Sequence, residues 1–187
     1  MSSSQGQTTE DQTTENSSIH VEDCVRRAIK GDGPAFQEIY KLCSPRVYGL
    51  MTRMVGRQNA DDLTQQVFMQ VFRKLEQFSG DSKLETWIYR LAVNEALQYL
   101  RREKRRKAHP LDFEPEDGST SRVETSELVE RLRKAIKQLD PELCAVITLK
   151  EDAGLSYREI AEAVGIPEGT VGSRLNRARA ELRKLLE

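Results

Sequence analysis

The stretch SYREIAEAVGIPEGTVGSRLNRARAEL, residues 156–182, determines the organisation of this chain, because its pattern is that of a helix-turn-helix. Ser156 and Glu159 have the spacing of a capping box, which begins a helix. Gly165 stands where that helix must end, since glycine enters the left-handed backbone region without a Cβ penalty, and Pro167 suits a new helix start. The pattern therefore predicts two helices joined by a tight turn.

The second helix of this pair is expected to face a core on one side and nucleic acid on the other. Its apolar side chains recur at steps of four, three and four residues: Val171, Leu175, Ala178 and Leu182. The rest of the helix is small, polar and cationic, and arginine and asparagine recognise guanine and adenine in the major groove. The candidate DNA-binding residues are Thr170, Ser173, Arg174, Asn176, Arg177 and Arg179. For this stretch alone, an ordinary two-helix corner with a solvated basic face remains the alternative.

The composition is that of a polar, helix-rich protein. The chain has 187 residues, enough for one ordinary domain or two small ones, with 32% charged and only 6% aromatic residues. No apolar run approaches the roughly 20 residues of a membrane span, and the polar N-terminus lacks the pattern of a signal peptide. We therefore expect no membrane insertion and a cytoplasmic location.

The sequence contains none of the usual signatures of catalysis or metal binding. Cys24, Cys43 and Cys144 lie far apart, with no CxxC pair, and only two histidines accompany them. Each cysteine is expected to be a small buried side chain, although a redox role stays open. A glycine-rich phosphate loop and a nucleophile–base pair are also missing, so no cofactor, metal or enzymatic activity is predicted.

The net charge of −1 conceals a strong charge pattern along the chain. Residues 24–107 carry 17 basic and 9 acidic side chains, whereas residues 1–23 carry 5 acids and no base and residues 108–127 carry 6 acids and one base. A polyanion responds to these local fields rather than to the average. A nucleic-acid partner is therefore compatible with the acidic overall balance.

Strand alternation is absent from the sequence, so the fold class predicted is all-α, with two small helical domains joined by a flexible acidic linker. The predicted parts are a disordered acidic tail over 1–18, a helical domain over 19–107, a linker over 108–125 and a helix-turn-helix domain over 126–187. In the first domain we expect helices over 20–30, from Pro34, from the Ser44–Pro45 pair and over 60–78. In the second, Leu128, Leu132, Ala135, Ile136 and Leu139 are expected to face the core.

Two surfaces of the first domain have both a structural and a functional interpretation. The helix over 60–78 has an apolar stripe that includes Leu63 and Phe78, with Phe72 in support, and a polar face that is explained most simply by solvation. The long helix that follows the SGDS turn ends in six cations among seven residues, 101–107. Such a run is either a solvated helix end or, with Asn94 nearby, a site for single-stranded nucleic acid. Trp87 is assigned to the core rather than to a stacking platform.

Three blocks of this sequence together resemble a known family. They are DDLTQQVF (61–68), FSGDSKLETWIYRLAVNEALQYLRR (78–102) and GLSYREIAEAVGIPEGTVGSRLNRARAEL (154–182). In this order and spacing they are similar to the extracytoplasmic-function sigma factors of bacterial RNA polymerase, which keep only the second and fourth sigma regions. The resemblance covers nearly everything from residue 20 onward.

The resemblance implies a role for each block. Asp61, Asp62, Leu63, Gln65 and Gln66 would dock on the clamp helices of the largest polymerase subunit, which replaces solvation as the explanation of that face. Ser82, Lys83, Asn94, Arg101 and Arg102 would bind the minus-10 element, where an extruded base costs a few kcal/mol. The helix from Gly169 to Arg179 would recognise the minus-35 element. The acidic linker would run toward the RNA exit path.

The implied partners are core RNA polymerase, including its flap region, promoter DNA and an anti-sigma factor. Two positions depart from the family pattern: Gly172 stands where Lys or Arg is usual, and Gln98 where many members have Asp. Gly172 implies weaker or unusual minus-35 binding and weakens the helix by up to about 1 kcal/mol. A stand-alone helix-turn-helix regulator is the competing function, and an N-terminal catalytic module is a distant third.

Overall fold

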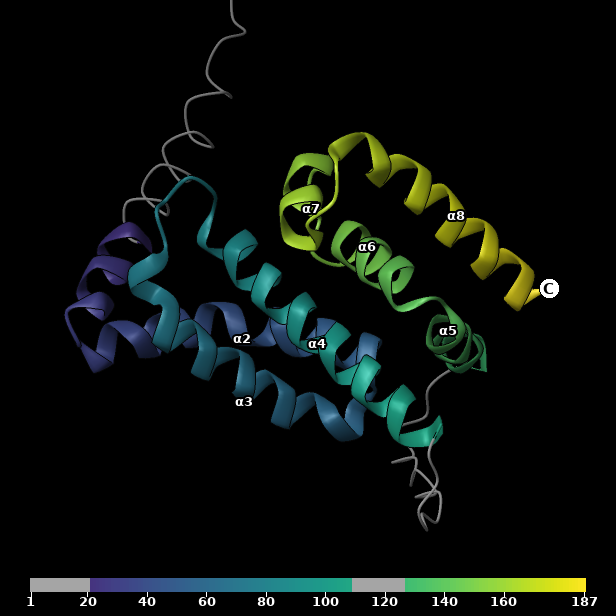
Figure 1. Ribbon diagram of the computed structural model, residues 1–187, viewed down its shortest axis with the longest axis horizontal. Coiled ribbons are helices and arrows are strands. Elements are labelled where there is room, and N and C mark those ends of the chain that lie inside the picture. The colour runs from purple at the N-terminus through teal and green to yellow at the C-terminus, as the bar shows by residue number, and fades with distance from the viewer. Residues whose placement is uncertain (1–20, 109–126) are drawn as a thin grey trace, which may run out of the picture.

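The computed structural model describes residues 21–108 and 127–187, and every regular element in these two ranges is a helix (Figure 1). The N-terminal domain contains a helix over 21–29, then α2 (Gly33–Val55), α3 (Arg57–Lys74), the short 3-10 helix η1 (Leu75–Gln77) and α4 (Leu84–Ala108). The C-terminal domain contains α5 (Glu127–Gln138), α6 (Pro141–Glu151), α7 (Tyr157–Val164) and α8 (Glu168–Leu186). The all-α prediction is confirmed. The predicted tail, and all of the predicted linker beyond Ala108, lie outside the described residues.

Helix α2 runs without interruption through Pro45, so the predicted helix start at Ser44–Pro45 is wrong. Proline inside a helix removes one backbone hydrogen bond and crowds the preceding turn. Here the buried stripe continues across it, from Ile39 and Cys43 to Val47 and Leu50. Packing of this uninterrupted stripe outweighs the local cost of the proline.

Helices α3 and α4 pack against α2 to form the core of the N-terminal domain (Figure 1). Gly56, with φ of +87°, lets the chain reverse between α2 and α3. Because α3 begins at Arg57, three residues earlier than the predicted start at Ala60, Asp61 and Asp62 fall in its second turn and not in the first. These acids therefore lie further from the N-terminal dipole than the sequence predicted.

The helix-turn-helix has the predicted local chemistry. The amide of Glu159 donates to the Ser156 hydroxyl at 3.3 Å, and the amide of Ser156 donates to the Glu159 carboxylate at 2.8 Å. Gly165 ends α7 in the left-handed conformation, with φ of +72°. Val171, Leu175 and Ala178 are buried along one side of α8. The capping box, the glycine stop and the core stripe of this motif are confirmed.

Helix α5 differs from its predicted packing. Leu128 is 67% exposed and Leu132 is 39% exposed, although the spacing placed both on the core face. Only Ala135 and Leu139 are buried, with Ile136 partly buried against the core. The C-terminal half of α5 therefore meets the core, whereas its first two turns leave apolar side chains in solvent.

The two domains pack against each other, with α6 at their centre. All seven residues from Leu143 to Leu149 are buried, so α6 is covered on every side. In Figure 1 it lies between α8 and the N-terminal domain, and it contacts α7 and α8 on one side and α2 and α4 on the other. Helix α7 lies along α4, and α5 contacts α2. The sequence patterns predicted both domains but not this contact between them.

Candidate nucleic-acid and protein interfaces

Helix α8 presents an exposed polar face away from its buried stripe. Ser173, Asn176 and Arg177 are exposed, and the Arg177 side chain is 70% accessible. Thr170 is half-buried, and its carbonyl accepts a hydrogen bond from the Ser173 hydroxyl at 2.8 Å. Side chains with hydrogen-bond donors on an exposed helix face are what major-groove recognition requires.

Each arginine of this face has a carboxylate partner. Arg174 lies 2.7 Å from Glu142 of α6, and Arg179 donates to Glu151, at the end of α6, at 2.7 Å. Sequence reasoning noted that no acid lies between Thr170 and Ala180, but it did not find these acids, because they come from another helix.

The third arginine of this face pairs within its own helix. Arg177 donates to Glu181, one turn further along α8, at 2.8 Å. Because the Arg177 pair is exposed and local, it contributes only a few tenths of a kcal/mol and exchanges readily for another anion. Arg174 is only 26% exposed, so it is the more firmly held of the two.

Gly172 lies at the contact between α8 and α7. A Cβ atom added to it would meet the Tyr157 ring at 3.5 Å, which is an ordinary van der Waals distance. The ammonium of Lys150 lies 5.6 Å from the centre of the same ring. The position therefore has room for a side chain, and the glycine is not required by packing.

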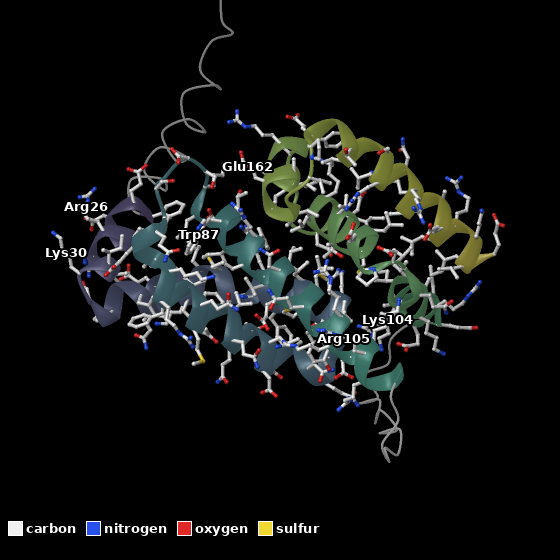
Figure 2. All side chains as sticks on the ribbon, in the orientation of Figure 1. Arg26, Lys30, Trp87, Lys104, Arg105 and Glu162 are labelled. Carbon is white, nitrogen blue, oxygen red and sulfur yellow. The ribbon has the colours of Figure 1, made fainter. Side chains whose placement is uncertain are left out.

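The predicted minus-10 residues extend along α4 instead of forming one cluster. Lys83 precedes the first turn, Asn94 lies mid-helix and Arg101 and Arg102 lie near its end, so they extend over about 28 Å at 1.5 Å per residue. Ser82 is half-buried in the turn before the helix, and the other four are exposed. Figure 2 shows Trp87 near one end of α4 and Lys104 and Arg105 near the other.

One exposed face of α4 carries more functional groups than the sequence suggested. Arg90, Asn94, Gln98, Arg101 and Arg105 recur at steps of four, four, three and four residues, and all five are exposed. We call this row the α4 stripe. Arg90, Gln98 and Arg105 were missed as candidates, although their helical spacing from Asn94 would have found them.

Arg102 lies beside this stripe and has a buried partner. It donates to Glu95 at 3.0 Å, and Gln70 of α3 donates to the other oxygen of the same carboxylate at 2.6 Å. Glu95 is only 6% exposed, so the pair is partly withdrawn from solvent. The predicted core role of Trp87 is confirmed, since its ring packs on the core with its centre 5.6 Å from that of Phe78.

The predicted polymerase-binding residues lie on the outer side of α3. Asp61, Asp62, Gln65 and Gln66 are exposed. Leu63 is 3% exposed and lies in the core, so its side chain is not available to a partner, and its assignment to this surface is corrected. The reason is its place in the apolar stripe that packs on α2.

Two features extend this surface beyond the predicted residues. A hollow of about 340 Å³ lies between α2 and α3, and Tyr40, Tyr48, Asp61, Asp62 and Gln65 are among its lining residues. Further along α3, Met69 and Phe72 are exposed, Phe72 by 61%. Phe72 was expected to support the core but instead makes an edge contact with Phe36, with 5.1 Å between ring centres.

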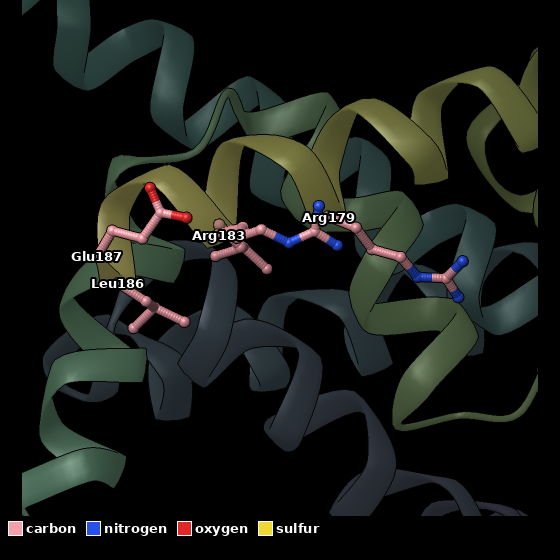
Figure 3. A pocket seen from close by; sticks show the side chains of 5 residues that line it. Arg179, Arg183, Leu186 and Glu187 are labelled. Carbon is pink, nitrogen blue, oxygen red and sulfur yellow. The ribbon is translucent and has the colours of Figure 1, made fainter.

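A second apolar surface lies at the end of the C-terminal domain. Figure 3 shows a hollow of about 420 Å³ lined by Arg179, Leu182, Arg183, Leu186 and Glu187. Helix α5, with its exposed leucines, packs against α8. This surface combines leucines with arginines.

The three cysteines are buried, as predicted. Burial raises the pKa of the Cys43 thiol to about 12 and that of Cys144 to about 11. Both are therefore protonated at neutral pH and are poor nucleophiles. Within residues 21–108 and 127–187, no cluster of His, Cys, Asp and Glu has the makings of a metal site, and no helix is long and apolar enough to cross a membrane.

Two family models match the chain: Sigma-70 region 2 over residues 39–106, and Sigma-70, region 4 over residues 129–182. The ECF RNA polymerase sigma-E factor of Haemophilus influenzae is 38% identical over 169 residues, which cover 83% of this chain and 89% of the relative. The RNA polymerase sigma-H factor of Pseudomonas aeruginosa is 34% identical over 177 residues, covering 87% and 92%.

Solved structures share the fold. CnrH in complex with the cytosolic domain of CnrY matches with a TM-score of 0.68 and 22% identity, over 89% of this chain and 97% of that one. The sigma factor RpoE of Bartonella quintana, in complex with the anti-sigma factor NepR, matches with a TM-score of 0.65 and 24% identity, over 81% and 96%.

Proposed function

Since this chain belongs to the extracytoplasmic-function sigma factors of the sigma-70 family, we propose that it directs core RNA polymerase to promoters by binding minus-35 DNA with α8 and melted minus-10 DNA with α4. It contributes binding energy and no chemistry of its own, so we assign it no enzymatic activity. Its place of action is the cytoplasm, where polymerase and promoter DNA are found.

The observation that carries this proposal is the α4 stripe. It has three arginines, one asparagine and one glutamine, and no acid, along one exposed face of a helix. Cationic groups neutralise phosphates along a strand, and amide side chains hydrogen-bond base edges, as binding of unpaired DNA requires. We assign minus-10 binding to the α4 stripe, with Ser82, Lys83 and Arg102 beside it.

For minus-35 DNA we assign Asn176 and Arg177 to base contacts and Ser173, Thr170, Arg174 and Arg179 to contacts with the backbone. Exposure supports the first two, since both point away from the core of the domain. The acidic partners of Arg174 and Arg179 must be displaced or shared for these two arginines to bind phosphate. Phosphate contacts of this kind position the helix without specifying sequence.

For polymerase we propose docking of the largest-subunit clamp helices on α3. Asp61, Asp62, Gln65 and Gln66 supply polar contacts, and the exposed Phe72 supplies an apolar one. Protein interfaces combine a desolvated aromatic anchor with a polar rim, which fits this combination. We propose the leucine-rich end of α5 and α8 as the surface for the flap region.

An anti-sigma factor is proposed as the regulatory partner. The support is the fold shared with the sigma factor RpoE, which was solved with the anti-sigma factor NepR. Both the α3 surface and the end of α8 are exposed in this chain and would be open to such a partner.

The test is transcription in vitro with purified core polymerase, genomic fragments from the source organism, and this protein added or withheld. We expect transcripts that start at defined sites only when the protein is present, and their upstream sequences will give both promoter elements. A failure to yield transcripts, together with binding of duplex DNA by a dimer of the protein alone, would replace this proposal with a stand-alone regulator.

A further inference from the structure

We propose that the two domains of the free chain form a closed state that competes with promoter binding, and that the interdomain surface made by α2 and α4 on one side and α5, α6 and α7 on the other must separate before both promoter elements are bound. This inference rests on the proposed function for its competitor, the promoter. The surface and its occupant, the other domain of the same chain, are features of the structure itself.

Two ion pairs cross the interdomain surface at separate places. The guanidinium of Arg53, near the end of α2, contacts both carboxylate oxygens of Asp152, with 2.8 Å to one and 2.6 Å to the other. Lys83, before α4, lies 2.8 Å from Glu159 of α7. Two separate pairs fix both the position and the rotation of one domain relative to the other, because a change in either would break at least one of them.

Between these pairs the surface is apolar. The thiol of Cys144 on α6 approaches the carbonyl oxygen of Arg53 at 3.9 Å, so α6 lies directly on α2. Every residue from Leu143 to Leu149 is buried, and a helix that is apolar on all sides needs cover on all sides. Helices α7 and α8 cover one side of α6, and the N-terminal domain covers the other. Exposed ion pairs alone contribute little, so this apolar contact is the main source of the closed state and the ion pairs give it specificity.

Closure competes with the promoter in two ways. First, Lys83, a candidate minus-10 contact, is bound by Glu159, the carboxylate that also caps the helix-turn-helix. Second, the two promoter elements are about 25 base pairs apart, which is about 85 Å at 3.4 Å per base pair. The longest helix of this chain, with 25 residues, measures about 38 Å. Domains in direct contact are too close together to bind both elements.

The chain has enough length to open. Residues 109–126 connect the two domains, and 18 residues reach at most about 65 Å when fully extended. Together with the dimensions of the domains themselves, this is enough to place α4 and α8 on separate elements. The α4 stripe stays exposed in the closed state, so the first contact with melted DNA does not require opening, whereas simultaneous contact does.

The size of the effect follows from population arithmetic. A site that is available in only one tenth of the molecules binds about tenfold more weakly than the same site in an open molecule. A variant that opens the chain should therefore bind a minus-35 duplex more tightly. Added positive charge would have the same effect on DNA binding, so the test variant should add negative charge instead.

Arg53→Asp is such a variant. It places two carboxylates together in the interdomain surface, and Arg53 belongs to neither proposed DNA surface. Charge alone predicts weaker DNA binding, whereas opening predicts tighter binding. Arg57→Asp makes the same change of charge four residues away, at the exposed start of α3, and is the matched control. The double variant Arg53→Asp/Asp152→Arg restores the ion pair with reversed polarity.

We would measure two quantities on the full chain: the radius of gyration by small-angle scattering, and the affinity for a duplex taken from the minus-35 side of a start site mapped by the transcription assay. We expect Arg53→Asp to be larger in solution and to bind that duplex roughly three- to tenfold more tightly than Arg57→Asp, and the double variant to return both values toward those of the unmodified chain.

Equal radii and equal affinities for Arg53→Asp and Arg57→Asp would overturn the proposal, as would an unmodified chain that is already extended. If no variant binds the duplex and no transcripts form, the proposed function fails, but the scattering comparison still decides whether the chain is closed. Circular dichroism spectra identical to that of the unmodified chain exclude unfolding as the cause of a larger radius.

Discussion

Arg177 is the residue through which α8 is best placed to recognise a base, because its side chain is exposed and its only partner named above is one turn away on the same helix. We expect Arg177→Ala to lower the affinity for a minus-35 duplex by about 1 to 3 kcal/mol and to relax the preference at one base pair. Fluorescence anisotropy with matched and substituted duplexes measures both.

The control for this variant is Arg158→Ala. Arg158 is also exposed and also pairs one turn further along its own helix, with Glu162 of α7, so the two variants lose the same kind of ion pair. If both variants lose equal affinity across all duplexes, Arg177 acts on phosphate and not on a base.

Gly172 is a position where function can be gained. Gly172→Lys would add a cation beside the DNA surface, and its Cβ would meet Tyr157 at an ordinary contact distance. We expect tighter minus-35 binding and a salt dependence steeper by about one unit of slope, as for one added phosphate contact. Gly172→Ala separates the charge from helix propensity: an equal gain for Ala and Lys would show that the helix alone is responsible.

Glu159 links the helix cap to the closed state, and its titration reports on both. The Lys83 ammonium, and then the amide and hydroxyl of Ser156, lower the pKa of this carboxyl from 4.5 to about 2 against the opposing effect of burial. A lowered pKa stabilises the folded state above about pH 4.5, and this contribution is lost as the pH falls toward 2.

We therefore expect the difference in stability between the unmodified chain and Glu159→Gln to be constant from pH 7 to about 5 and to shrink between pH 4.5 and 3. Thermal unfolding at each pH measures it. Glu162→Gln, which removes an exposed carboxylate from the same helix, is the matched control. A difference that is unchanged down to pH 3 would mean that Lys83 and Ser156 do not hold this carboxylate.

At the scale of elements, α2 makes an untested compromise at Pro45. The residue is exposed in mid-helix, where it leaves the carbonyl of Lys41 without its usual amide donor. We expect Pro45→Ala to raise the free energy of unfolding by about 1 to 3 kcal/mol, less the entropy that proline removes from the unfolded chain. Denaturant unfolding measures it. Pro34→Ala is the control, because in the first turn no hydrogen bond is missing.

Elements whose signals are local were predictable from the sequence. The capping box at Ser156 and the glycine stop at Gly165 lie within a few residues of what they control, so α7 and α8 follow from the pattern. Continuation of α2 through Pro45 does not, because it depends on packing of residues on both sides of the proline. The exposure of Leu128 was missed for the same reason: spacing shows that apolar residues share a face but not whether another helix reaches it.

The candidate site shows the same division. The exposed amides and arginines of α8 follow from helical periodicity, whereas the carboxylates that pair with Arg174 and Arg179 come from α6 and were not predictable from α8 alone. Leu63 was assigned to the polymerase surface by position in a motif, and its burial shows that a motif includes residues that support a surface without joining it.

For the whole molecule, the arrangement of the domains was beyond reach of pattern reasoning, although one signal was present. The run LCAVITL in α6 is apolar at every helical angle, which indicates cover on all sides, and a four-helix domain of this size can supply cover on only some of them. The remaining cover comes from a domain that is far away in the sequence, and nothing local to α6 identifies it.

The burial of α6 also bears on how long this protein survives in solution. Once the domains part without polymerase to receive them, one side of α6 is bare, and contiguous exposed apolar surface promotes association between chains. Chains opened by mutation or by heat should therefore precipitate at lower concentrations than closed ones, and proteases should cut them sooner. Storage at high concentration thus favours the closed form, which makes domain contact a safeguard of the unused pool as well as a competitor of the promoter.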